Sequence, residues 1–529
     1  MPLSEVRAGM SCTGLSVVKG TAIASFGVEV LDVIADDPAV GGARLLVRVS
    51  GPAVDATGVG PGFSGSPILC AGRTAGAISE GIGEYGNKVV LATPIEAILG
   101  ARPRAAAGAR RAPRLLRSAR SLAGPLTASG LSPRARRLLA RAAERTGRTV
   151  LAAPPGPLGG YPVQDLRPGA AVAASLSTGD VSIGAVGTVA YRDGNQVFAF
   201  GHALDGLGRR ALFLQDSYVF AVIGNPLGVP DFGMSYKLAS SGGHPLGAVT
   251  NDTFSAIAGT IGGGPPSIPL HVTARRRGGG EPVVLDSRLA DERELDLGAG
   301  IGLIAPLAAS TALDRLLGSL QPAAMTVCTR FRVRELRRPI GVCNPYFDGF
   351  AALADISEAS SLVDSFDLAP LHIRRSSVTI AVDGDFADDV LVGAQAPKRV
   401  RRGSTVPVRV GLRRRHSGAR RTITVRVPIP ADIRPGARTL VLAGNGFGDE
   451  EDELLIELVG ELSGEAQAQA AQSEPRSVQQ LARAVARLHD PQGIEARWRH
   501  REPRVVLRSS EVRFDGRATV RLRVLAARR

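Results

Sequence analysis

Short apolar runs separated by turns are the feature that most constrains how this 529-residue chain can fold. Its 64 glycines and 35 prolines interrupt the apolar residues throughout the sequence. Short apolar runs bounded by glycine and proline are typical of strands, whereas buried helices need longer periodic stretches. The sequence therefore predicts a mainly β protein, and its length allows several domains with sizeable cores.

The spacing of these runs and turns predicts five regions. We expect a β unit with a serine-containing turn at 1–100, an Arg-rich linker with one helix at 101–162, a β unit with a mixed extension at 163–375, an immunoglobulin-like sandwich at 376–460, and a small α/β unit of hinge, helix and closing strands at 461–529. Two helices carry start signals: Ser132 precedes Pro133, and Ser477 lies three residues before Gln480.

The net charge is +15, but the composition argues against nucleic acid as the partner. Only four of the 64 basic residues are lysine, and this preference for Arg, beside much Ala and Gly, is what a GC-rich genome produces. Aromatic residues make up 4% of the chain and leave little for stacking on bases. There is no P-loop, no His-x-x-x-His and no Cys-x-x-Cys, so we expect no cofactor and no metal ion.

The four cysteines allow two interpretations. Cys12 and Cys70 both lie in the first β unit near the serine turn, and Cys328 and Cys343 flank a segment that is typical of a hairpin. Two disulfide bonds at these places would fit an exported protein. Four buried thiols are the alternative.

Neither a membrane-spanning helix nor a leader is predicted. The longest uncharged run, 253–274, contains four glycines and three prolines and cannot form a continuous apolar helix. The opening MPLSEVRAG lacks the apolar core of a signal peptide. The chain is therefore expected to be either cytoplasmic or without its true start.

The stretch GPGFSGSPIL at 60–69 contains a candidate nucleophile, Ser64. An acyl-transfer serine needs an accessible hydroxyl, a base within reach, and N–H groups aimed at the developing oxyanion. Gly62 and Gly65 flank Ser64 and allow a sharp turn, which Pro67 ends before a strand. The spacing resembles the serine turn of chymotrypsin-like enzymes, which implies an oxyanion hole formed by the N–H groups of Gly62 and Ser64. A purely structural turn is the alternative.

Among the seven histidines, His202 is the first candidate for the base. It follows an apolar strand and a glycine in VFAFGHAL, where a loop begins. The strand belongs to a predicted hairpin whose turn contains Asp193-Gly194. His244, in SSGGHPLG, is the second candidate, and a structural role for either histidine is the alternative.

Together the two segments resemble the SpoIVB-type serine peptidases, a chymotrypsin-like family. The sequence GFSGSPI at 62–68 is similar to the family's Gly-Met-Ser-Gly-Ser-Pro-Ile, and Gly201-His202 is similar to its Gly-His after an apolar strand. The serine segment comes first here, as in exported bacterial proteins that carry this domain. The resemblance covers about residues 1–275.

The resemblance implies a chymotrypsin-like β-barrel unit built from two β segments. It implies Ser64 as nucleophile and His202 as general base in a serine endopeptidase that acts on a protein or peptide substrate. A secreted or cell-surface location is expected from the same resemblance.

The third member of the triad stays open at this point. The position where the family has an acidic residue is held by Ser50. Asp216 is ranked slightly ahead of Asp55 and Asp205, and a Ser–His dyad is the alternative. A catalytically inactive, peptidase-like binding protein at the cell surface or outside the cell is the second function considered, and a buried Ser64 hydroxyl would favour it.

Overall fold

The structure is a computed structural model that divides into two compact units. The first unit contains Met1–Leu270, Asp286–Ile304 and Leu462–Gly464, and the remaining residues form the second. The structure describes residues 1–34, 42–82, 85–100, 120–121, 126–224, 235–318, 323–384, 386–444, 450–463, 475–488, 493–499 and 504–526. The first part of the predicted Arg-rich linker, at 101–119, and most of the predicted polar hinge, at 464–474, lie outside these residues.

A closed six-stranded barrel forms the first part of unit one. Its strand order is β4-β1-β2-β3-β6-β5, and pairing of β4 with β5 closes it. Apolar side chains alternate into the barrel, so that Leu45, Val47 and Val49 of β3 are fully buried. The strands are β1 (Ser11–Lys19), β2 (Ala22–Ile34), β3 (Arg44–Ser50), β4 (Pro67–Cys70), β5 (Arg73–Gly81) and β6 (Val89–Pro94).

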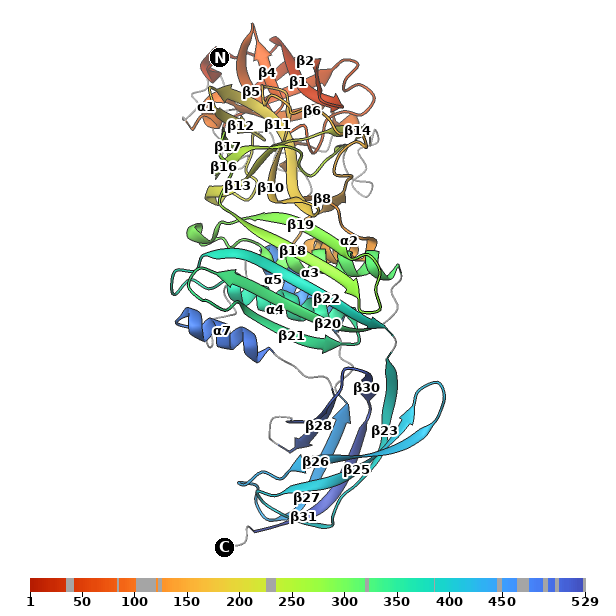
Figure 1. Cartoon of the computed structure of the whole chain (residues 1–529). Helices are drawn as coiled ribbons and strands as arrows, with labels where there is room; N and C mark the ends of the chain where they lie inside the picture. The colour runs from red at the N-terminus through yellow and green to blue at the C-terminus, as the bar shows by residue number, and fades with distance from the viewer. Residues whose placement is uncertain are drawn as a thin grey trace. The chain divides into compact units, whose positions relative to one another are not determined.

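A second closed six-stranded barrel follows in the same unit. Its order is β10-β13-β16-β17-β12-β11, closed by pairing of β10 with β11. The predicted hairpin is confirmed, because β11 and β12 pair up to Asp193 and Gln196 and Gly194 has φ +55°. Both barrels belong to the red-to-green part of the chain in Figure 1. The strands are β10 (Ala171–Gly179), β11 (Ser182–Asp193), β12 (Gln196–Ala199), β13 (Gly208–Asp216), β16 (Pro245–Thr253) and β17 (Ala256–Ile261).

Shorter elements complete the first unit. The predicted helix is confirmed as α2 (Pro133–Arg145): Ser132 Oγ accepts from the Ala135 N–H at 3.2 Å, and the helix buries Leu138 and Leu139. This burial shows that α2 is a packed helix and not part of a solvated tether. The other elements are α1 (Ile95–Ile98), β7 (Arg120–Ser121), β8 (Leu126–Ser129), β9 (Val150–Ala152), β14 (Val219–Ile223), β15 (Tyr236–Ala239) and β19 (Val283–Ala290).

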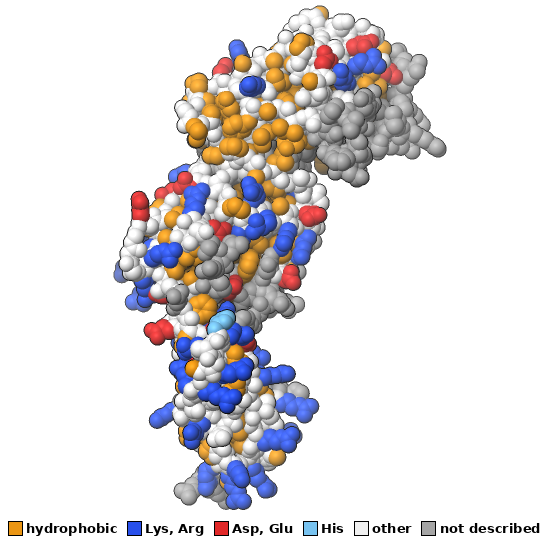
Figure 2. All heavy atoms as spheres, turned by 90° about the vertical axis from the view of Figure 1, so that its right-hand side faces the viewer, with side chains coloured by type: hydrophobic (Ala, Val, Ile, Leu, Met, Phe, Trp, Pro, Cys, Tyr) orange, Lys and Arg blue, Asp and Glu red, His pale blue; other side chains and the backbone are white. Residues whose placement is uncertain are grey.

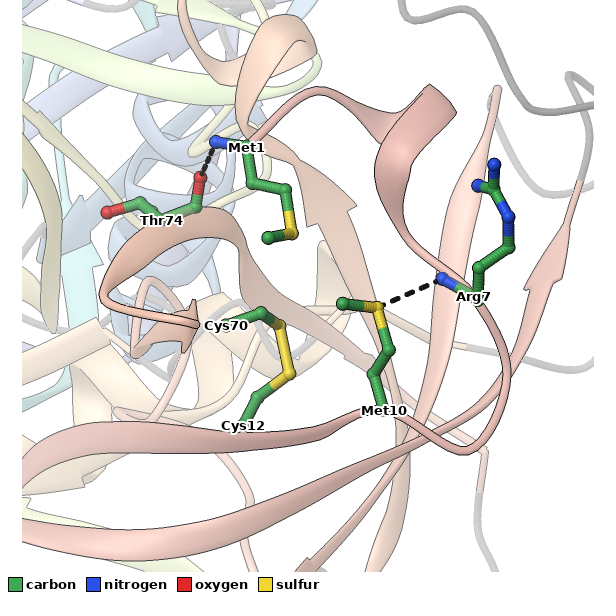
Figure 3. The surroundings of a disulfide bond; sticks show 6 residues. All are labelled: Met1, Arg7, Met10, Cys12, Cys70 and Thr74. Carbon is green, nitrogen blue, oxygen red and sulfur yellow. Dashed lines mark hydrogen bonds between the residues drawn. A yellow bond between two sulfur atoms is a disulfide. The ribbon is translucent and has the colours of Figure 1, made fainter.

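Both cysteine pairs form disulfide bonds. Cys12 of β1 is joined to Cys70 of β4, with 4.4 Å between the Cα atoms (Figure 3). Cys328 is joined to Cys343, which stands directly opposite it across the hairpin of β20 (Ala324–Val333) and β21 (Ile340–Tyr346). The alternative of four buried thiols is therefore wrong.

The second unit begins with a sheet and helices. The strand order is β21-β20-β22-β18, formed by β18 (Ser267–Arg276), β20 (Ala324–Val333), β21 (Ile340–Tyr346) and β22 (Ile373–Gly384). The helices are α3 (Ile301–Leu317), α4 (Gly349–Asp364), α5 (Glu450–Ser463) and α7 (Val478–Arg487). The predicted cap of α7 is confirmed, since Ser477 Oγ accepts from the Gln480 N–H at 3.3 Å. None of the helices in the described part of the chain has the length and apolar character needed to cross a membrane.

Two sheets that share one hydrophobic core form the rest of the second unit. Their orders are β26-β25-β23-β30 and β24-β31-β27-β28-β29. Strict alternation in β25 buries Val406, Val408, Val410 and Leu412 against this core. We call these two sheets the sandwich. Its strands are β23 (Ala387–Gln395), β24 (Arg399–Arg401), β25 (Thr405–Arg414), β26 (Arg420–Pro428), β27 (Gly436–Gly444), β28 (Gly493–Trp498), β29 (Arg504–Arg508), β30 (Val512–Asp515) and β31 (Arg517–Leu525).

Two predictions for the C-terminal part of the chain need correction. The closing strands, expected in a small α/β unit, instead complete the sandwich: β28 and β31 flank β27, and β30 pairs with β23. The expected sandwich also extended to residue 460, but Glu450–Ser463 is the helix α5. Leu454, Leu458 and Leu462 recur every four residues and are buried, and this period favours a helix over a strand.

Candidate active site

The serine turn, residues 60–66, connects β3 to β4 and depends on its glycines. Gly62 has φ +93° and Gly65 has φ +89°, in the left-handed region that side-chain-bearing residues avoid. The Phe63 side chain is fully buried and anchors the turn in the core of the first barrel. The sequence thus fixes a sharp turn with Ser64 between two left-handed residues.

The hydrogen bonds of the turn leave two of its backbone N–H groups without an acceptor in the described residues. The Phe63 N–H donates to Gly60 O, the Gly65 N–H donates to Ile78 O and the Ser66 N–H donates to Phe63 O, at 2.8–2.9 Å. Within the described residues, the N–H groups of Gly62 and Ser64 donate to no protein acceptor. These are the two amides that the sequence analysis assigns to an oxyanion hole.

Thr188 of β11 holds the serine turn against the second barrel. Its N–H donates to Ser64 O at 2.8 Å, and its hydroxyl donates to Gly62 O at 2.9 Å. A Cβ atom at Gly65 would stand 1.9 Å from Thr188 O and 2.6 Å from Phe200 N. The turn therefore lies directly on β11 and on the end of β12, and only glycine fits at position 65.

His202 follows the end of β12, next to the place where the serine turn contacts Phe200. Phe200 and Gly201 both have positive φ, +71° and +68°, and turn the chain sharply before the histidine. Thr93 Oγ1 donates to Gly201 O at 2.6 Å, which ties this turn to β6 of the first barrel. The serine turn and the strand end that carries His202 thus meet where the two barrels pack together.

The surroundings of the His202 ring select a tautomer. Nδ1 lies 2.7 Å from Ala203 O and, in the neutral ring, donates to it, so that the lone pair is on Nε2. His202 is 4% exposed. The loop that follows is held by Asp252, whose carboxylate accepts from the N–H groups of Leu204, Asp205 and Gly206 at 2.7–2.8 Å. A histidine held in this tautomer has the form that a general base requires.

The Ser64 hydroxyl is buried. Ser64 has no exposed surface. Its Oγ makes no hydrogen bond with any described residue, and so none with His202. A hydroxyl in this state is neither activated by a base nor open to a substrate in this conformation.

The structure does not bring Asp216 to His202. Asp216 is fully buried at the end of β13, and its carboxylate accepts from Tyr161 Oη at 2.9 Å, from the Gln164 N–H at 2.9 Å, and from the N–H and Nδ1 of His244 at 2.7 and 2.8 Å. Asp216 therefore pairs with the second histidine candidate, His244. Desolvation of the phenol, and then the buried carboxylate of Asp216, raise the pKa of Tyr161 above its ordinary range.

The other two acid candidates also have different partners. Asp205 pairs with Arg148 and Arg210, at 2.7 and 3.1 Å, and Asp55 pairs with Lys88 at 3.2 Å on the surface. The contacts of the described residues therefore give each of the three acid candidates a partner other than His202.

A buried lysine beside the serine turn was missed by the sequence analysis. Lys237 of β15 is 5% exposed, and its Nζ donates to Ser16 Oγ at 2.7 Å and to Thr188 Oγ1 at 3.0 Å. Nζ also lies 4.5 Å from the centre of the Phe63 ring, and the Lys237 N–H donates to Pro61 O at 2.9 Å. Burial lowers the pKa of Lys237 to about 7. The only signal in the sequence is one of four lysines set in the apolar strand YKLA.

Comparison with known proteins gives no further assignment. No family model, no curated protein and no solved structure matches the chain. Among the described residues, no three His, Cys, Asp or Glu side chains gather in a way that could hold a metal ion.

Proposed function

We propose that this chain is a serine endopeptidase of the SpoIVB type, with a chymotrypsin-like pair of barrels, and that Ser64 and His202 act as a dyad. The observation that carries the proposal is the serine turn. Its two unbonded amides belong to Gly62 and Ser64, while the amide between them is bonded. This turn contacts Phe200, which follows the end of β12 and lies two residues before His202.

The proposed reaction uses groups of this chain alone. Ser64 Oγ attacks the carbonyl carbon of the scissile peptide bond, and its proton moves to His202 Nε2. The N–H groups of Gly62 and Ser64 hold the oxyanion. His202 then protonates the leaving amine, the C–N bond breaks and an acyl-enzyme remains. A water molecule, deprotonated by His202, attacks this ester, and the Ser64 hydroxyl is restored as the acid product leaves.

If the chain is a peptidase, the conformation with a buried Ser64 hydroxyl is an inactive one. A substrate carbonyl has to reach Ser64 Oγ, which has no exposed surface here. Activity and labelling therefore require the serine turn to move, as gating steps do in other enzymes, and the proposal includes such an open form in solution.

The two disulfide bonds support an exported protein. Disulfides persist in oxidising compartments and are rare in the cytosol of most organisms. Both pairs, Cys12–Cys70 and Cys328–Cys343, are formed here. We therefore propose a secreted or cell-surface peptidase that acts on protein or peptide substrates.

Labelling with a fluorescent fluorophosphonate tests the proposal. The purified wild type should be labelled, and Ser64→Ala and His202→Ala should both lose the label while they keep the circular dichroism spectrum of the wild type. Asp216→Asn should keep the label, because Asp216 pairs with His244 rather than with His202. Loss of labelling in folded Asp216→Asn, with labelling of His202→Ala retained, would contradict the assignment of the base.

A second function, a catalytically inactive binding protein with peptidase-like barrels, is favoured by one observation. Ser64 Oγ is buried and makes no hydrogen bond in the described residues, which is the state expected of a serine that has only a structural role. A folded wild type that takes up no fluorophosphonate under any condition would support this second function.

A further inference from the structure

The sandwich carries a large excess of positive charge. Its two ranges, 387–444 and 493–525, contain 22 Lys and Arg residues and 7 Asp and Glu residues. The rest of the chain contains 42 residues of each sign, and within it the stretch 101–150, with 13 Arg and one Glu, is a second basic region. Figure 2 shows Lys and Arg side chains across the face of the sandwich that it presents. Genome composition would spread arginines over the whole chain and does not explain this local excess.

A cleft in the sandwich collects several of these arginines. It has a volume of about 810 Å³ and is formed by the β27 strand, the loop before it, the end of β28 and β31. Its charged and aromatic lining consists of Arg434, Arg438, Arg499, Arg521, Asp432 and Trp498. The volume is in the range of sites that bind a ligand of several chemical units.

Three of the cleft arginines are available to a ligand. Arg434, Arg499 and Arg521 are exposed and, within the described residues, make no hydrogen bond or ion pair. Arg414 of β25 provides the contrast, since it is paired with the buried carboxylate of Asp389. Arg438 is held in place by its own backbone, because it donates to Ala437 O and Pro435 O.

We propose that this cleft binds a linear anionic polymer whose charges are phosphates or carboxylates and that carries no bases. Guanidinium groups form paired hydrogen bonds with both anions, and several of them along one open cleft favour a chain over a single small ion. Nucleic acid fits less well, because single-stranded recognition uses exposed aromatic rings. Among the described residues that line the cleft, Trp498 is the one aromatic side chain, and it is 7% exposed. The proposal is independent of the peptidase chemistry.

Binding of fluorescent probes to the full chain tests the proposal. The probes are inorganic polyphosphate and a polyuronate, which separate the two anion types, and a single-stranded oligonucleotide of equal charge. The wild type should bind at least one of the first two more tightly than the oligonucleotide, and the affinity should fall steeply with salt. Tighter binding of the oligonucleotide, or no binding of any probe at low salt, would overturn the proposal.

A matched pair of variants separates the cleft from diffuse charge. The cleft variant is R434Q/R499Q/R521Q, and the control is R409Q/R413Q/R426Q, which removes three exposed arginines from the other sheet. The cleft variant should lose at least about tenfold in affinity and reduce the salt slope by about 2, whereas the control should lose less than about threefold. Equal losses in two variants with unchanged circular dichroism would assign the binding to diffuse charge and refute a site in the cleft.

Discussion

Replacing Lys237 by Met should remove most of the pH dependence that this lysine gives to the stability of the barrels. The side chain is buried and its Nζ donates to two hydroxyl groups, those of Ser16 and Thr188. Burial penalises the charged ammonium and lowers the pKa of Lys237 from 10.5 to about 7. The unfolded chain keeps the ordinary value, so the two states bind different numbers of protons over a wide pH range.

The size of the effect follows from this difference in pKa. A fall from 10.5 to about 7 corresponds to about 5 kcal/mol of free energy of unfolding. Below pH 7 the lysine is charged in both states and the whole cost of burial is present. Between pH 7 and 10.5 the unfolded state binds more protons, so stability rises with pH. Between pH 6 and 9 the gain amounts to about 3 kcal/mol.

Urea unfolding followed by circular dichroism at several pH values between 6 and 9 measures this slope. Lys237→Met should be flatter than the wild type by about 3 kcal/mol across the range. Lys88→Met is the matched control, because Lys88 is a half-exposed lysine of the same unit and should leave the slope unchanged. The fluorescence of Trp498, the one tryptophan, reports the sandwich separately and should not respond. Equal slopes in the wild type and Lys237→Met would refute the reasoning.

Three further predictions concern the serine turn and the first barrel. Gly65→Ala should lower the free energy of unfolding of the barrels in urea by about 3 kcal/mol, because its Cβ would stand 1.9 Å from Thr188 O at φ +89°. Gly72→Ala, which has open space around its Cβ, should lower it by only about 1 kcal/mol. Similar losses for both variants would contradict the predicted clash. Thr188→Val should reduce fluorophosphonate labelling about tenfold, because the serine turn loses the hydrogen bond that holds Gly62 O, and Thr188→Ser should restore it; unchanged labelling in Thr188→Val would show that this hydrogen bond is not needed. C12S/C70S should lower the free energy of unfolding by about 4 kcal/mol, given the separation of 58 residues, and a loss below about 1 kcal/mol would show that the bond does not constrain the unfolded chain.

Much of the fold could be predicted because its signals are local. The turn at Asp193-Gly194 and the caps Ser132 and Ser477 follow from backbone preferences of a few neighbouring residues. The proximity of the serine turn and the His202 strand was expected from a resemblance that covers both segments. The helix α5 was missed because its leucines follow a long series of strands and were counted with them.

The rest depends on contacts that sequence spacing does not encode. Lys237 meets Ser16 only because β15 of the later segment lies against the first barrel, 221 residues away in sequence. Asp216 and His244 are brought together by the pairing of β13 with β16, and neither residue type indicates this partner by itself. The basic residues of 493–525 join those of 387–444 in one sandwich only through strand pairings that are distant in sequence.

Site-resolved mass spectrometry of the fluorophosphonate-treated protein tests the central claim most directly. The account predicts one phosphonyl adduct in the wild type, on the peptide that contains Ser64, and none on that peptide in folded His202→Ala. An adduct on another residue, or an adduct on Ser64 that persists at the same rate in His202→Ala, would contradict the proposal that His202 activates Ser64.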